Sequence, residues 1–192
     1  MHESERWTRL FADLEDELCG LAAAERTAET AVRVRIDTGR RTLSERFAAS
    51  RGAVVRISVA AGAPLRGEDL CGEVLDVGSD WLLLHAGRLY LIALAAVLTA
   101  DGLATPAVAP PLPTGSAGRI DLRMMLRRLA RERLPVLLGL RDRSALEGTI
   151  DRVGADQVDL ALHAADEPRR AAAVRGARTV ALSALAWVQL RP

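Results

Sequence analysis

The feature that most constrains the fold of this chain is an internal repeat. The segment GEVLDVGSDWLLL (72–84) returns later as GTIDRVGADQVDL (148–160). At the end of each copy, apolar and polar residues alternate as in a half-buried strand. The Gly-Ser-Asp and Gly-Ala-Asp triplets within the copies supply residues that favour a turn. Each copy therefore predicts a β-hairpin, and the chain should contain two similar units.

The similarity continues on both sides of the hairpins. VVRISV (54–59) matches PVLLGL (135–140), and IALAAV (92–97) matches VALSAL (180–185). Each unit also opens with a segment of helical character, 43–50 in the first and 120–134 in the second. We therefore predict an α+β fold with two units, each a helix followed by four or five short strands.

The predicted units span residues 39–101 and 119–192. Between them lies a linker rich in proline, GLATPAVAPPLPTGSAG (102–118), which we expect to be sensitive to protease over residues 104–116. Short twisted strands in so few residues hide their edges by curling, so each unit is expected to close into a small barrel.

These features resemble the Sm-like or SH3-like small β-barrel, which has a leading helix and a bent strand that carries a glycine (here Gly72 and Gly148). VRG (174–176) is similar to the Arg-Gly of the second Sm motif. The whole chain, including RLFADLEDEL and DVGSDWLLL, also resembles a group of uncharacterised actinobacterial proteins that are sometimes labelled Fis-type transcriptional regulators. The resemblance implies two tandem barrels and a role near nucleic acid. Because the chain has no asparagine, uridine recognition in the Sm manner is not expected.

Residues 1–38 form a predicted helical arm. Its apolar residues follow heptad spacing, at Trp7, Phe11, Leu14 and Leu18. The first hairpin carries Trp81 and Leu83 at positions predicted to face outward, where the second carries Gln157 and Asp159. We expect the arm to cover the Trp81–Leu83 face, and a homodimer through the arm is the alternative. Residues 32–41 fit either a helix or a strand.

Arginines recur through the second predicted helix and a later loop. They are Arg119, Arg123, Arg127, Arg128 and Arg131 in the helix, and Arg169, Arg170, Arg175 and Arg178 in the loop. Together they predict a surface that contacts phosphates. The alternative is a charged helix face that is simply solvated.

Several function classes are excluded or not indicated. The chain has no lysine, so it lacks a Walker A lysine and a lysine Schiff base for pyridoxal phosphate. No catalytic motif occurs, and His2, His85 and His163 lack the spacing of metal ligands. No catalytic residue, cofactor or metal is therefore predicted.

The remaining features indicate where the protein acts and what it binds. The first residues are charged and the longest apolar run, 89–98, is shorter than the roughly 20 residues of a membrane-spanning helix, so we expect a cytoplasmic protein without a membrane partner. The leading hypothesis is a non-catalytic binding module that contacts DNA or RNA through its arginines. The alternative, favoured by a formal net charge of only +1, is a protein-interaction adaptor with no nucleic-acid role.

Overall fold

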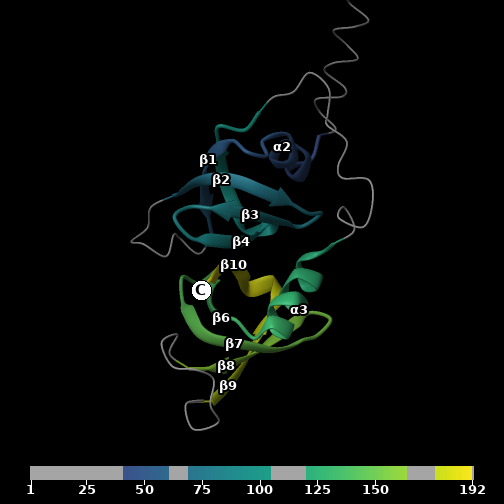
Figure 1. Cartoon of the computed structure of the whole chain (residues 1–192), viewed down its shortest axis with the longest axis vertical. Coiled ribbons are helices and arrows are strands. Elements are labelled where there is room, and N and C mark those ends of the chain that lie inside the picture. The colour runs from purple at the N-terminus through teal and green to yellow at the C-terminus, as the bar shows by residue number, and fades with distance from the viewer. Residues whose placement is uncertain (1–40, 61–68, 105–119, 164–175, 192) are drawn as a thin grey trace, which may run out of the picture. The chain divides into compact units, whose positions relative to one another are not determined.

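The computed structural model describes residues 41–60, 69–104, 120–163 and 176–191. Thr42–Pro192 belong to one compact unit, which contains nearly all of the described residues. The predicted arm and nearly all of the predicted linker lie outside the described residues, as does most of the segment 32–41. Figure 1 shows the described elements of the unit.

Two α-helices begin the two repeats, as the sequence predicted. The first, α2, spans Leu43–Ala49, and the second, α3, spans Leu122–Glu132. The short α2 begins with a capping box, in which Thr42 Oγ1 accepts the Glu45 N–H (3.3 Å) and Glu45 Oε2 accepts the Thr42 N–H (2.7 Å). Phe47 is the residue of α2 that lies in the core, and the helix packs against β2 and β3.

The strands of each repeat follow its helix in the same order. In the first repeat they are β1 (Val54–Val59), β2 (Leu70–Val77), β3 (Trp81–His85), β4 (Leu89–Ala93) and β5 (Val97–Asp101). In the second they are β6 (Pro135–Leu140), β7 (Ala145–Val153), β8 (Gln157–Leu162), β9 (Gly176–Ala181) and β10 (Leu185–Leu190). A single turn of 3₁₀ helix joins the last two strands of each repeat, η1 (Leu94–Ala96) and η3 (Leu182–Ala184).

The two repeats agree in fine detail. The pairing of β2 with β3 shifts register between Val74 and Asp76, and the pairing of β7 with β8 shifts between Ile150 and Arg152, which are the matching positions. These β-bulges explain why the alternation of apolar residues breaks there in the sequence. The Leu94 N–H binds the Asp80 carbonyl (2.9 Å), and the Leu182 N–H binds the Asp156 carbonyl (2.7 Å).

The prediction of an α+β fold with two closed barrels is wrong. The described strands form one antiparallel ten-stranded open sheet in the order β5-β1-β2-β3-β4-β10-β6-β7-β8-β9. Closing each repeat on itself would require β4 to pair with β5 and β9 to pair with β10. Instead β4 pairs with β10 of the other repeat, and β5 and β9 are left at the two ends of the sheet.

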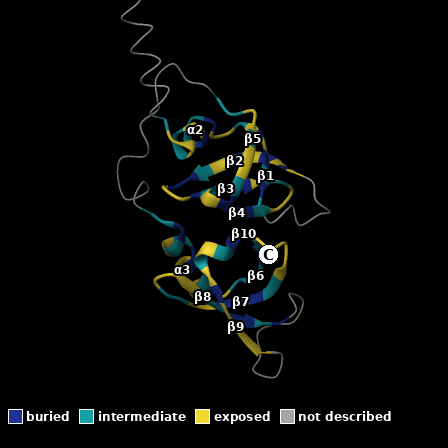
Figure 2. Cartoon of the chain, turned by 180° about the vertical axis from the view of Figure 1, so that it is seen from behind, coloured by how far each residue is buried: buried dark blue, intermediate teal, exposed yellow. Residues whose placement is uncertain are grey.

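The seam between β4 and β10 is strongly apolar, which accounts for this pairing. Its register joins Ile92 to Trp187, Leu91 to Val188 and Tyr90 to Gln189. All six side chains are buried, and the Tyr90 and Trp187 rings meet edge to face with centroids 5.9 Å apart. The seam therefore removes apolar surface and strand-edge hydrogen-bonding groups of both repeats from water at once. The buried core runs through both repeats as one cluster (Figure 2).

Candidate nucleic-acid interface

The amphipathic helix α3 provides the candidate site. Its buried residues are Leu122, Leu126 and Leu129, which recur at helical spacing and hold the helix against the sheet, chiefly on β7. Arg133, in the left-handed backbone region (φ 51°), ends the helix. The opposite face of α3 is left to solvent, with arginines spaced along it.

Two carboxylates hold the first turn of α3. Asp121 is the N-cap, and its Oδ1 accepts the Met124 N–H at 2.8 Å. Asp80, from the turn between β2 and β3, accepts the Leu122 N–H at 2.8 Å. Partial burial acts to raise the pKa of Asp121, but the hydrogen bonds from Met124 and Arg123 and the nearby arginine charges outweigh it and lower that pKa. The N-terminus of α3 is thus capped by its own Asp121 and bonded to the first repeat through Asp80.

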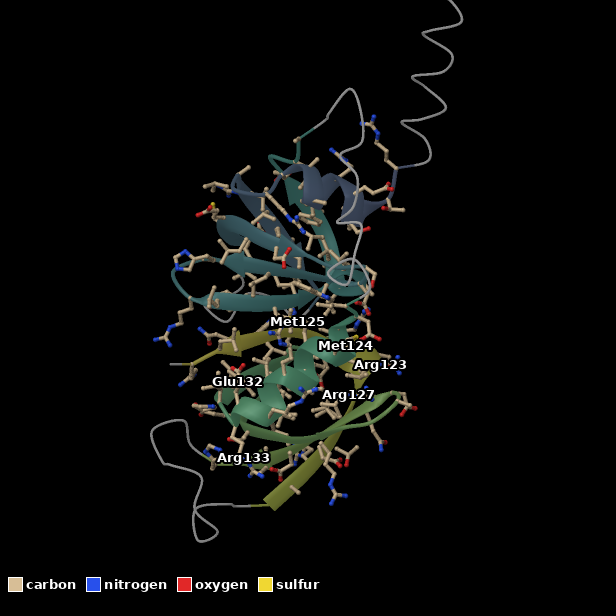
Figure 3. All side chains as sticks on the ribbon, turned by 45° about the vertical axis from the view of Figure 1, so that its right-hand side comes forward. Arg123, Met124, Met125, Arg127, Glu132 and Arg133 are labelled. Carbon is tan, nitrogen blue, oxygen red and sulfur yellow. The ribbon has the colours of Figure 1, made fainter. Side chains whose placement is uncertain are left out.

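The arginines of α3 fall into two groups. Arg123 is held by Asp121, with an Nη2–Oδ2 distance of 3.0 Å, and it also donates to the Ala155 carbonyl (3.2 Å). Arg127, Arg128 and Arg131 are exposed, and no carboxylate of the described residues forms an ion pair with any of them. We call these three side chains the basic face of α3. Figure 3 views the helix, with Arg123, Met124 and Arg127 labelled along it.

Of the remaining predicted arginines, only Arg178 belongs to the described residues. Arg119, Arg169, Arg170 and Arg175 lie outside the described residues. Arg178 is exposed on β9, an end strand of the sheet, and β8 separates β9 from β7, where α3 packs. Arg178 is therefore two strands away from the strand that carries α3, with neighbouring strands about 4.8 Å apart.

Trp81 has a structural role within the described unit. The indole is buried, with 2% of its surface exposed, and its Nε1–H donates to the Ile120 carbonyl at 2.8 Å. The position is therefore not outward-facing, because the segment that leads into α3 lies against it. Leu83 is half-buried and packs against the core. Trp7, Phe11, Leu14 and Leu18, the proposed partners of this face, lie outside the described residues.

A cavity of about 670 Å³ lies where the two repeats meet. Its lining comes from the β3–β4 turn, the end of α3 and the end of β10. The apolar lining residues are Leu89, Leu129, Leu134 and Leu190, and the polar ones are His85, Arg88, Glu132 and Arg191. This cavity could not be predicted from the sequence, because its residues come from three distant segments without a shared motif.

The two described histidines, His85 and His163, occupy different positions of the repeat and different environments. By strand register, His85 of the first repeat corresponds to Ala161 of the second, not to His163. His85 is exposed, whereas His163 is buried with Nε2 2.7 Å from Thr149 Oγ1. Within the described ranges, no three His, Cys, Asp or Glu side chains are grouped so that they could hold a metal ion.

Comparison of the chain with models of known protein families and with curated protein sequences gives no match. In the part of the chain that the structure describes, no helix combines the length and the apolar character needed to cross a membrane.

Proposed function

We propose that this protein is a non-catalytic, cytoplasmic binding module that contacts the phosphate backbone of DNA or RNA through the basic face of α3. The observation that supports this most is the combination of three exposed arginines on one anchored helix, none of which forms an ion pair with a carboxylate of the described residues. Guanidinium groups bind phosphate oxygens through two parallel hydrogen bonds, and they remain charged at any physiological pH.

The anchoring of α3 supports the same proposal. Because Asp80 and Asp121 both bind the first turn, the helix presents its arginines from a fixed backbone. Little backbone entropy is then lost when a ligand binds. Arg123 contributes less in this scheme, since its guanidinium already has partners in Asp121 and Ala155.

Fluorescence anisotropy with labelled duplex DNA and single-stranded RNA, measured over a series of salt concentrations, tests the proposal. The variant Arg127→Gln/Arg128→Gln/Arg131→Gln should lose at least about tenfold in affinity at low salt. The slope of log affinity against log salt concentration should become shallower by about 2–3, which corresponds to two or three lost phosphate contacts.

A control with the same loss of charge is Arg46→Gln/Arg56→Gln/Arg141→Gln, which changes three exposed arginines that lie neither on α3 nor on β7, the strand on which α3 packs. It should bind nearly as well as the native chain. An equal loss of affinity in both triple variants would show that net charge, and not the basic face of α3, determines binding. If the native chain does not bind nucleic acid at low salt, the proposal is wrong.

The cavity favours a second candidate function, a protein-interaction adaptor. Its leucine lining and its arginines and glutamate suit a partner's apolar side chain flanked by charges. Affinity purification after nuclease treatment, comparing the native chain with Leu190→Asp, distinguishes the two functions. Protein partners that survive nuclease and are lost with the variant would support the adaptor, whereas recovery only through nucleic acid would contradict it.

A further inference from the structure

The described sheet has two open edges, β5 and β9. Each pairs on one side only, β5 with β1 and β9 with β8. A strand at the end of a sheet presents unpaired N–H and C=O groups, which can pair with another strand of suitable register. Figure 2 shows much exposed surface on β5 and β9, while β4 and β10 are buried.

The internal repeat relates these two edges to the seam. The strand equivalent to β4 in the second repeat is β9, and the strand equivalent to β10 in the first repeat is β5. Within the chain, β4 pairs with β10. The strands at the two free edges, β9 and β5, are the repeat equivalents of β4 and β10. The β5 edge of one copy of the chain could therefore pair with the β9 edge of a second copy, as β10 pairs with β4 in the seam.

Transfer of the seam register to the free edges predicts the residue pairs. Val180 corresponds to Ile92, and Leu185 corresponds to Val97, in the aligned repeats. The seam pairs Ile92–Trp187, Leu91–Val188 and Tyr90–Gln189 then become Val180–Thr99, Thr179–Ala100 and Arg178–Asp101 between two chains.

The side chains at these positions are compatible with such a contact. In the seam, the Gln189 amide donates to the Tyr90 hydroxyl at 3.0 Å. The equivalent pair, Asp101 and Arg178, carries opposite charges, and both residues are exposed. Leu98 on β5 is 65% exposed, although its equivalent in the seam, Ala186, is fully buried. An exposed leucine on an open edge strand is apolar surface that a further strand would cover.

We propose that copies of this chain associate head to tail by pairing β5 of one with β9 of the next. The contact is heterologous, so repeated addition gives either a closed ring or an open chain of subunits, depending on the rotation between copies. The free edges are more polar than the seam, with Thr99, Asp101, Arg178 and Thr179 in place of buried apolar or amide side chains. The association is therefore weaker than the seam and depends on protein concentration.

Sedimentation velocity of the full-length chain without nucleic acid, from about 1 to about 100 μM, tests the proposal; this range covers the micromolar affinities of weak interfaces. Native protein should show species larger than one chain that grow with concentration. Arg178→Glu places two acids opposite each other and should weaken association by about tenfold or more. The combined variant Arg178→Glu/Asp101→Arg restores opposite charges in the reverse order and should recover it.

Circular dichroism and thermal unfolding of each variant show whether the monomer fold is kept, and the recovery in the combined variant cannot arise from misfolding. A native chain that stays monomeric over the whole range would overturn the proposal. Association that is unchanged in both Arg178→Glu and Arg178→Glu/Asp101→Arg would also overturn it, because the contact would then have to use another surface, such as residues 1–40. Nucleic acid is absent throughout, so either result is independent of the proposed function.

Discussion

Asp80 and Leu122 lie on different repeats, and the Asp80 carboxylate accepts the backbone N–H of Leu122 at a distance of 2.8 Å. The first repeat thereby supplies a cap for the helix that opens the second. Next to it, the Trp81 indole donates to the Ile120 carbonyl, so two consecutive residues of one turn fix the entry of the chain into α3. The equivalent positions of the second repeat are Asp156 and Gln157, which are exposed.

Removal of the Asp80 carboxylate should destabilise the junction between the repeats. Asp80→Ala is expected to lower the free energy of unfolding by about 0.5–2 kcal/mol, the usual cost of a lost helix cap. Urea denaturation measures it. Asp156→Ala is the matched control, because only the backbone carbonyl of Asp156 has a described hydrogen bond, and alanine keeps that group. Equal costs for the two substitutions would show that the bond to Leu122 contributes nothing specific.

The two repeat glycines should not tolerate a side chain. A Cβ at Gly148 would collide with the Ala161 carbonyl, and one at Gly72 would collide with the His85 carbonyl, in each case on the adjacent strand. Because backbone has to move, Gly148→Ala and Gly72→Ala should each cost about 1–3 kcal/mol of stability in thermal or urea unfolding. Glu73→Ala, at an exposed position of β2, should change stability by less than about 0.5 kcal/mol. A neutral Gly148→Ala would mean that β7 and β8 are further apart than described.

The buried pair Tyr90 and Gln189 should be coupled across the seam. Tyr90→Phe leaves the Gln189 amide with one hydrogen-bond partner fewer in a buried site, which should cost about 1–3 kcal/mol. Gln189→Met removes the amide, and in its background Tyr90→Phe should cost less. A double-mutant cycle with urea denaturation measures this coupling, expected to be at least about 0.5 kcal/mol.

The control for the seam is Thr179→Val on the exposed edge strand β9, which removes the hydroxyl that donates to Asp159. A substitution at this exposed site should stay within about 0.5 kcal/mol of the native stability. Additive costs for Tyr90→Phe and Gln189→Met would show that the hydrogen bond between them is not formed in solution.

Acid should weaken the N-cap of α3. The pKa of Asp121 is lowered in the folded protein, so its contribution to stability is present above the pKa of an unfolded aspartate. That contribution is lost as the pH falls through the lower folded-state pKa. Stability measured by urea denaturation should therefore fall less between pH 7 and pH 3 in Asp121→Asn than in the native chain. Some acid sensitivity should remain, because hydrogen bonds from Ser144 also lower the pKa of Asp142. An unchanged pH dependence in Asp121→Asn would contradict the assignment.

The sequence predicted the local features of the fold and missed its pairing between repeats. Helical character, turn residues and the alternation at the end of each hairpin depend on neighbouring residues, so the two helices and the repeated hairpins could be predicted. The partner of β4 is β10, which lies almost a hundred positions later in the chain, so local patterns do not indicate this pairing. The continuous apolar run that holds Tyr90 and Ile92 indicates a buried segment, but it does not show what buries it.

The candidate site shows the same division. The four-residue spacing of arginines identified the exposed side of α3, because helical periodicity is local. The separation of Arg178 from that helix, and the burial of Trp81 beneath Ile120, depend on contacts between distant segments. The cavity beside Leu129 and Leu190 depends on such contacts as well.

The seam also sets an order of events during synthesis of the chain. Strand β4 is complete long before its partner β10 leaves the ribosome, and at typical rates of translation the delay is roughly 5–20 s. Throughout that interval the nascent first repeat carries Tyr90, Leu91 and Ile92 on an unprotected edge. The growing polypeptide is therefore most exposed to aggregation or to chaperone capture in the middle of its translation, and a ribosome that stalls before Leu185 releases a half-sheet that cannot be completed.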